Sequence, residues 1–115
     1  MKKIKIVPVF LLLAISGCAS STPPLYEWGH YEDLIYQGYA HGDKLSPDEH
    51  IAKLQADYEV AKSKNRPVPP GYHAQLGFLY YKMGKPEEAK KSFSNEEELF
   101  PESKAYMTRI IDKIK

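Results

Sequence analysis

The sequence has 115 residues, with 16 basic and 15 acidic side chains and a formal net charge of +1. This length suits one small domain, and the balanced charge without a basic stripe argues against a nucleic-acid partner. The single cysteine excludes an internal disulfide.

The first 17 residues have the pattern of a lipoprotein signal peptide. Three lysines precede an apolar run over residues 6–15, which is about 15 Å long as a helix and too short to span a bilayer. The run ends in the letters ISGC, which resemble the lipobox read by lipoprotein signal peptidase. We expect cleavage before Cys18 and lipid on its thiol; the alternative is a small buried cysteine that happens to follow a signal peptide.

Cleavage there leaves 98 residues. The removed segment contains three lysines and no acidic residue, so the remaining chain has 13 basic and 15 acidic side chains. Ala19 stands where an aspartate retains Gram-negative lipoproteins on the inner membrane, which predicts the periplasmic face of the outer membrane. Residues 18–25 are small, polar and proline-containing, and form a flexible tether of at most about 25 Å. Residues 26–115 form the domain.

Five helices and no strand are predicted in this domain, beginning with one over about 30–40. Spacings of three and four residues predict its inner face, which is Trp28, Tyr31, Ile35 and Tyr39. The second helix starts at a capping box over residues 46–49 and ends near Lys64, because three prolines follow before residue 71. Its apolar stripe is Ile51, Leu54, Tyr58 and Ala61.

The third helix is expected from Tyr72 to Met83, with Gly84 as its left-handed cap. Its inward residues are Leu76, Leu79, Tyr80 and Met83. Pro86 opens the fourth helix, which turns Ala89 and Phe93 inward and ends at Pro101. A fifth helix from about Glu102 buries Met107, Ile110, Ile111 and Ile114 on one side.

Residues 73–101 resemble one tetratricopeptide repeat. The residues that carry the resemblance are Leu76, Gly77, Tyr80, Gly84, Ala89, Phe93 and Pro101. Small residues at 77 and 89 suit a close crossing of two helices, while Tyr80 and Phe93 fill the space beside it. The preceding residues do not repeat the pattern, so we expect a compact, all-α, tetratricopeptide-like domain, with an unrelated helical hairpin as the alternative.

Taken whole, the chain resembles a small lipoprotein family known as domain of unknown function 4810. Three segments carry the resemblance: LYEWGHY at 25–31, PPGYHAQLG at 69–77 and FPES at 100–103. That family is similar in setting to curli-type secretion lipoproteins, and its members tend to be encoded beside one. The resemblance implies an accessory subunit of an envelope assembly, with such a lipoprotein as its partner, and it supplies no catalytic residues.

No motif in the sequence indicates an enzyme, and we predict neither a cofactor nor a metal. His41, Asp43 and His50 lie near one another, but no two histidines have the spacing that puts zinc ligands on one helix face. Exposed loop histidines are the simpler interpretation. The acid run over residues 96–98 is interpreted as a solvated helix face.

Aromatic residues crowd the start of the domain. We interpret Trp28, Tyr31 and Tyr39 as core, while Tyr26 and Tyr36 are the candidates to stay exposed and bind a partner. A second candidate surface lies on the concave face of the repeat, at Tyr72, His73, Gln75 and Tyr80.

These observations predict a lipid-anchored scaffold or adaptor that binds an envelope protein through its helical surface. The alternative is a periplasmic module that uses tyrosine and tryptophan to bind glycan or peptidoglycan. A metal-dependent enzyme is a third and weaker hypothesis.

Overall fold

The structure, a computed structural model, describes residue 2 and residues 22–115. The expected cleavage site, Cys18 and Ala19 lie outside the described residues. Within residues 22–115 the chain is all-α, with five α-helices and no strand, as the sequence predicts. None of the described helices is both long and apolar enough to cross a bilayer.

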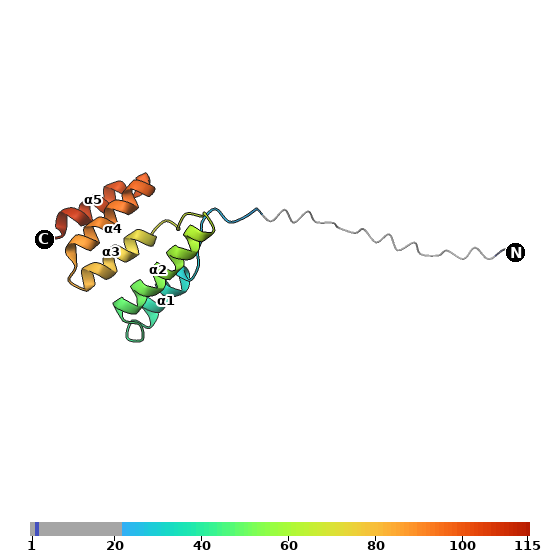
Figure 1. Cartoon of the computed structure of the whole chain (residues 1–115), viewed down its shortest axis with the longest axis horizontal. Coiled ribbons are helices and arrows are strands. Elements are labelled where there is room, and N and C mark those ends of the chain that lie inside the picture. The colour runs from blue at the N-terminus through green and yellow to red at the C-terminus, as the bar shows by residue number, and fades with distance from the viewer. Residues whose placement is uncertain (1, 3–21) are drawn as a thin grey trace.

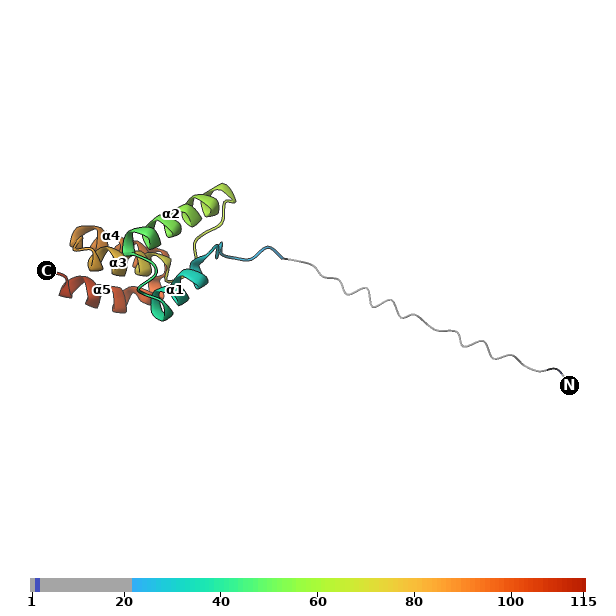
Figure 2. The same ribbon diagram turned by 90° about the horizontal axis from the view of Figure 1, so that it is seen from below.

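The helices form two halves that meet along α3 (Figures 1 and 2). Their bounds are α1 Tyr31–Ala40, α2 Pro47–Ser63, α3 Tyr72–Lys82, α4 Pro86–Leu99 and α5 Lys104–Lys113, with a 3-10 turn η1, Pro101–Ser103, before α5. The first half is the hairpin of α1 and α2, and an extended, proline-rich segment over residues 64–71 leads from it to α3 (Figure 1). In the second half, α4 packs closely on both α3 and α5.

Local sequence signals account for the helix ends. The Ser46 hydroxyl accepts the Glu49 amide at 3.3 Å and the Ser46 amide donates to the Glu49 carboxylate at 3.1 Å, which completes the predicted capping box. Gly84 follows α3 with a φ of +70°, and Pro86 is the first residue of α4. The last helix starts with the 3-10 turn and becomes α-helical only at Lys104.

Two apolar clusters stabilise the two halves, and α3 contributes to both. The first consists of Leu34, Ile51, Leu54, Ala61, Val68, Tyr72, Leu76 and Leu79. The second consists of Ala89, Phe93, Met107 and Ile114. Tyr80 packs against both clusters, so this side chain joins the halves.

The helices α3 and α4 cross closely because Gly77 has no side chain. A Cβ atom placed on Gly77 would lie 2.6 Å from the nearest ring atom of Phe93, which is too close for any real contact. Phe93 and Ala89 are fully buried. Gly77 and Phe93, a small and a large residue of the repeat pattern, therefore pack directly against one another.

The predicted inner face of α1 is wrong for Trp28 and Tyr39, whereas Tyr31 packs against the first apolar cluster as predicted. Leu34 is the buried residue of this helix, whereas Tyr39 is 86% exposed and Trp28 is 41% exposed. Gly29, with a φ of +47°, turns the backbone just before the helix, so Trp28 does not extend the helical stripe. Tyr31 and Ile35 are half-buried at the edge of the Leu34 face, and Tyr58 on α2 is 38% exposed.

Candidate functional site

A groove of about 350 Å³ lies between α2, α3 and α4. Its floor is Leu76 and Tyr72 of α3, and its walls include Gln55 and Tyr58 from α2. The opposite wall comes from α4, where Glu88, Lys91 and Asn95 face the same space. This set of lining residues is called the groove below.

Aromatic rings form the end of the groove nearest the start of α3. The rings of Tyr58 and Tyr72 stack with centroids 6.1 Å apart and planes 22° apart. The His73 ring meets both edge-on, at 6.3 Å from Tyr58 and 5.1 Å from Tyr72. The three rings hold each other in place, so this end of the groove presents a rigid aromatic surface.

Burial sets the electrostatics of that surface. Desolvation lowers the pKa of His73 below its ordinary value of 6.5, so the ring is neutral at pH 7. Burial raises the pKa of Tyr72, and its hydroxyl donates to the backbone oxygen of Leu54 at 2.7 Å. The aromatic end is therefore uncharged, while Glu88 and Lys91 supply opposite charges along the α4 wall.

A hydrogen bond crosses the groove from α2 to α3. The Gln55 amide nitrogen lies 3.3 Å from the Tyr80 hydroxyl, to which it donates. Gln55 is itself exposed, and Asn95 supplies a second side-chain amide on the α4 wall. Both amides can donate to and accept from the backbone of an extended chain.

A buried carboxylate on α4 fixes the start of α3, and so the position of His73. Glu96 is 3% exposed and accepts backbone amides from Gly71 at 2.6 Å, His73 at 3.1 Å and Ala74 at 3.2 Å. It therefore satisfies helix-terminal donors that have no intrahelical partner. The interpretation of the 96–98 acids as a solvated face is wrong for this residue.

The sequence offered a weak signal for that contact. Glu96 follows Phe93 by three residues and Ala89 by seven, so it lies on the apolar face of α4. The start of α3 lacks a side-chain cap of its own, because Gly71 occupies the N-cap position. Which acid would supply the cap depends on the packing of two helices, and that packing cannot be derived from local spacing.

The residues predicted to bind a partner do not form one surface. Tyr72, His73 and Tyr80 all line the groove, but Tyr72 is only 2% exposed. Its ring belongs to the core beneath the groove and offers a partner little free surface. Gln75 points to a different hollow of about 370 Å³ between α1, α2 and α3.

The two N-terminal tyrosines also differ. Tyr36 is 65% exposed on α1, and its ring meets that of His41 at 6.0 Å. Tyr26 is half-buried, with its ring 6.0 Å from that of Phe100. Tyr26 therefore fastens the start of the domain to the end of α4, and it is less available to a partner than predicted.

The histidines are placed differently from the prediction of exposed loop residues. His50 is 2% exposed within α2, and its Nε2 atom has no hydrogen-bond partner among the described residues. His41 and Asp43 are exposed in the loop before α2. In the described part of the chain, no three side chains of metal-ligating type gather at one place.

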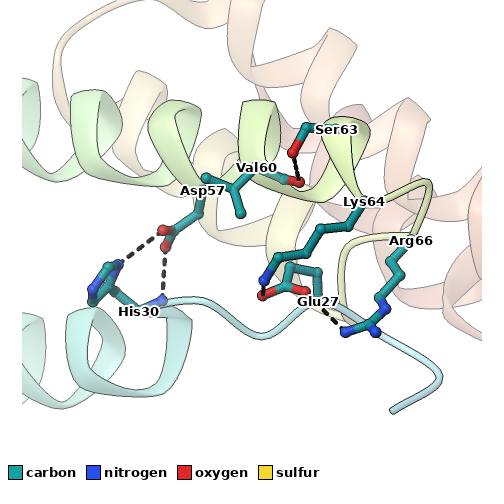
Figure 3. Close-up of polar contacts among 7 residues, drawn as sticks. All are labelled: Glu27, His30, Asp57, Val60, Ser63, Lys64 and Arg66. Carbon is teal, nitrogen blue, oxygen red and sulfur yellow. Dashed lines mark hydrogen bonds and ion pairs between the residues drawn. The ribbon is translucent and has the colours of Figure 1, made fainter. Parts of the chain in front are cut away.

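A segment before α1, residues 25–30, is bound along the end of α2 (Figure 3) and is called the strap below. The Glu27 carboxylate pairs with Lys64 at 3.1 Å and Arg66 at 3.4 Å, and its amide donates to the Pro67 oxygen at 2.9 Å. The side chain and amide of His30 contact Asp57 at 2.9 and 2.8 Å. Local sequence patterns do not predict these ion pairs and hydrogen bonds, because the partners are 27 to 39 residues apart in the chain.

The comparisons with known proteins add one finding. No curated protein and no solved structure matches the chain. A family model described as domain of unknown function, DUF4810, matches residues 25–110, which include the strap, the groove and most of α5. The chain belongs to the DUF4810 family.

Proposed function

We propose that this chain is a lipid-anchored adaptor of the bacterial envelope, whose groove binds an extended segment of a protein partner. The resemblance to a tetratricopeptide repeat supports this function, because such repeats use the concave side of a helix pair for binding. The setting of the family supports an accessory subunit of an outer-membrane assembly or secretion complex. A curli-type secretion lipoprotein is the partner we propose.

The groove is the single observation that carries the proposal. Its volume of about 350 Å³ is at the lower end of the range for ligand sites, enough for a few residues of peptide. The stacked ring of Tyr58 offers rigid apolar area at little entropic cost, which is typical of binding hot spots. Gln55 and Asn95 stand on opposite walls, where their amides can bond the backbone between them.

Lipid on Cys18 would complete this function. Several acyl chains hold a protein stably at a bilayer, whereas one chain does so only marginally. A tether of at most about 25 Å then confines the groove near partners in the same membrane. Confinement raises their effective concentration, so a weak groove is sufficient for capture.

Photo-crosslinking in cells tests the groove directly. A photoreactive residue replaces Gln55 in one strain and Lys91 in another, so that the two opposite walls are probed separately. We expect both positions to give an adduct with the same protein. Adding Tyr58→Ala should weaken both adducts, because that ring supplies the exposed aromatic surface of the groove.

Lys104 is the matched control position. It is an exposed lysine at the start of α5 and lines no part of the groove, so we expect no adduct there. Equal adducts from positions 91 and 104 would contradict the proposal, as would groove positions that give none. Adducts with glycan strands in place of protein would favour the peptidoglycan-binding alternative.

A further inference from the structure

The strap and the residues that follow α2 lie side by side at one end of the domain, next to residues 22–24 (Figure 1). Exposed apolar and cationic side chains occur together there. Leu25 is 72% exposed and Trp28 is 41% exposed, both on the strap. The side chains of Lys64 and Arg66, which follow α2, are 48% and 32% exposed. These four residues are called the tether end.

The strap fixes this arrangement to the folded domain. Between Leu25 and Trp28, Glu27 forms ion pairs with both cations (Figure 3). Its backbone amide also donates a hydrogen bond to the Pro67 oxygen. Trp28 also packs edge-on against Tyr26 at 6.3 Å and beside Tyr31 at 6.1 Å. Leu25 and Trp28 therefore have set positions on the domain surface, and only the residues before them can act as tether.

The short tether limits how far the tether end can lie from the membrane surface. Seven residues separate the Cys18 position from Leu25, so the two are at most about 25 Å apart. The headgroup layer of one leaflet is roughly 6 Å thick, given a total bilayer thickness of about 40–45 Å around a 30 Å core. A chain anchored at Cys18 thus keeps Leu25 and Trp28 within reach of the membrane surface.

We propose that the tether end lies against the phospholipid interface, with Leu25 and Trp28 at the level of the headgroups. This inference rests on the proposed lipid anchor at Cys18. Indole rings favour the boundary between headgroups and acyl chains, where one edge is wet and the other apolar. Lys64 and Arg66 lay their apolar stems along the surface, and the single positive charge that remains after they pair with Glu27 is attracted to lipid phosphates.

The charge balance makes the apolar contact the main one. Two cations accompany Glu27 at this end, which leaves a single net positive charge. The proposed contact orients the domain on the membrane, and none of its four residues lines the groove.

Trp28 is the only tryptophan in the chain, so its fluorescence reports on the tether end alone. The lipidated protein is placed in vesicles of phosphatidylethanolamine and phosphatidylglycerol, with or without phospholipid brominated near the headgroup end of its acyl chains. We expect a shift of the emission to shorter wavelength on vesicle binding, and a loss of emission with brominated lipid. Leu25→Asp should weaken that loss, whereas Leu99→Asp, at another exposed leucine, should not.

A second protein carries Trp28→Phe and Tyr106→Trp, which moves the probe to an exposed position on α5. Its emission should be insensitive to brominated lipid, while its circular dichroism should match that of the parent. Equal quenching at both positions, or none at position 28, would overturn the proposed orientation. Mass spectrometry shows whether the protein carries lipid, and vesicle flotation shows whether it binds the vesicles. Lipidated, vesicle-bound protein without quenching contradicts only the proposed orientation. Protein that carries no lipid contradicts the proposed anchor as well.

Discussion

Two buried polar side chains determine much of the chemistry of this domain at the scale of single residues. Glu96 accepts three backbone amides at the start of α3, where a helix concentrates positive partial charge. His50, in contrast, is buried with an Nε2 atom that lacks a hydrogen-bond partner among the described residues. The Glu96 carboxylate therefore stabilises the fold, whereas the unpaired Nε2 atom of His50 carries a desolvation cost.

Replacing the Glu96 carboxylate should destabilise the domain. In Glu96→Gln, one acceptor oxygen becomes a donor that faces backbone amides, and hydrogen bonds to charged groups contribute roughly 1.5–3 kcal/mol. We expect a loss of about that size in the free energy of unfolding, measured by urea denaturation. Glu98→Gln is the control, because Glu98 is exposed and such a change costs less than about 0.5 kcal/mol. Equal losses in both variants would show that Glu96 does not cap α3.

The stability of the domain should fall in mild acid because of His50 and His73. Burial lowers the pKa of both residues below 6.5, and Lys82 and Lys53 lower that of His50 further. The folded state then binds fewer protons than the unfolded state as the pH falls below 6.5. The free energy of unfolding is therefore unaffected by these two histidines above pH 6.5, and it decreases as the pH falls from 6.5 toward their lowered pKa values.

Replacing His50 should reduce this pH dependence. His50→Leu removes one of the two groups, so its melting temperature should fall less than that of the parent between pH 7 and pH 5. It also removes a buried polar atom without a partner, which should raise the free energy of unfolding at pH 7 by roughly 1 kcal/mol. Thermal unfolding of both proteins at the two pH values is the measurement, and identical slopes would exclude His50 as a source of the acid sensitivity.

At the scale of elements, the helix ends follow from the sequence and the helix faces do so only in part. The capping box at Ser46 and Glu49, Gly84 and Pro86 act within a few residues, so they can be read directly. The inner face of α1 depends on where α2 lies. The spacing of the aromatic residues predicted Ile35 as an inward position, whereas the buried residue is its neighbour Leu34. The strap depends on ion pairs between distant residues, which no local pattern reveals.

The site could be predicted to a similar extent. The repeat pattern indicated α3, and three of the predicted residues line the groove: His73, Tyr80 and, as part of its buried floor, Tyr72. The walls from α2 and α4 were not predicted, because they require the positions of three helices. Tyr72 was assigned to the surface because an aromatic residue at the start of a helix can face either way, and only the packing on Leu54 and Tyr58 places it in the core.

The close crossing of α3 and α4 should be sensitive to one added methyl group. Gly77→Ala places a Cβ atom 2.6 Å from the Phe93 ring, and overpacking of this kind costs typically about 1–3 kcal/mol. Gly38→Ala is the matched control, since its nearest neighbour is 3.4 Å away and alanine favours a helix by roughly 0.5–1 kcal/mol. We expect urea denaturation to show destabilisation of the first variant only. A stable Gly77→Ala protein would mean that the two helices are farther apart than described.

At the scale of the whole molecule, the strap contacts and the groove are made by different residues of one domain. The strap joins the outgoing chain to the end of α2, and Tyr26 joins it to Phe100 at the end of α4. The groove uses other residues of α2 and α4, together with α3. In the proposed arrangement, the anchor holds the groove within a short distance of the membrane.

The dependence of partner capture on the anchor tests this account most directly. The photoreactive residue at position 91 is combined with the native Cys18 or with Cys18→Ala, and both proteins are expressed to equal levels in the periplasm. We predict the same adduct from both but much less of it without the lipid, because confinement raises effective concentration. Circular dichroism should show that the domain without lipid is folded. Equal capture by the two proteins would contradict the account, since the groove would then bind its partner without help from the membrane.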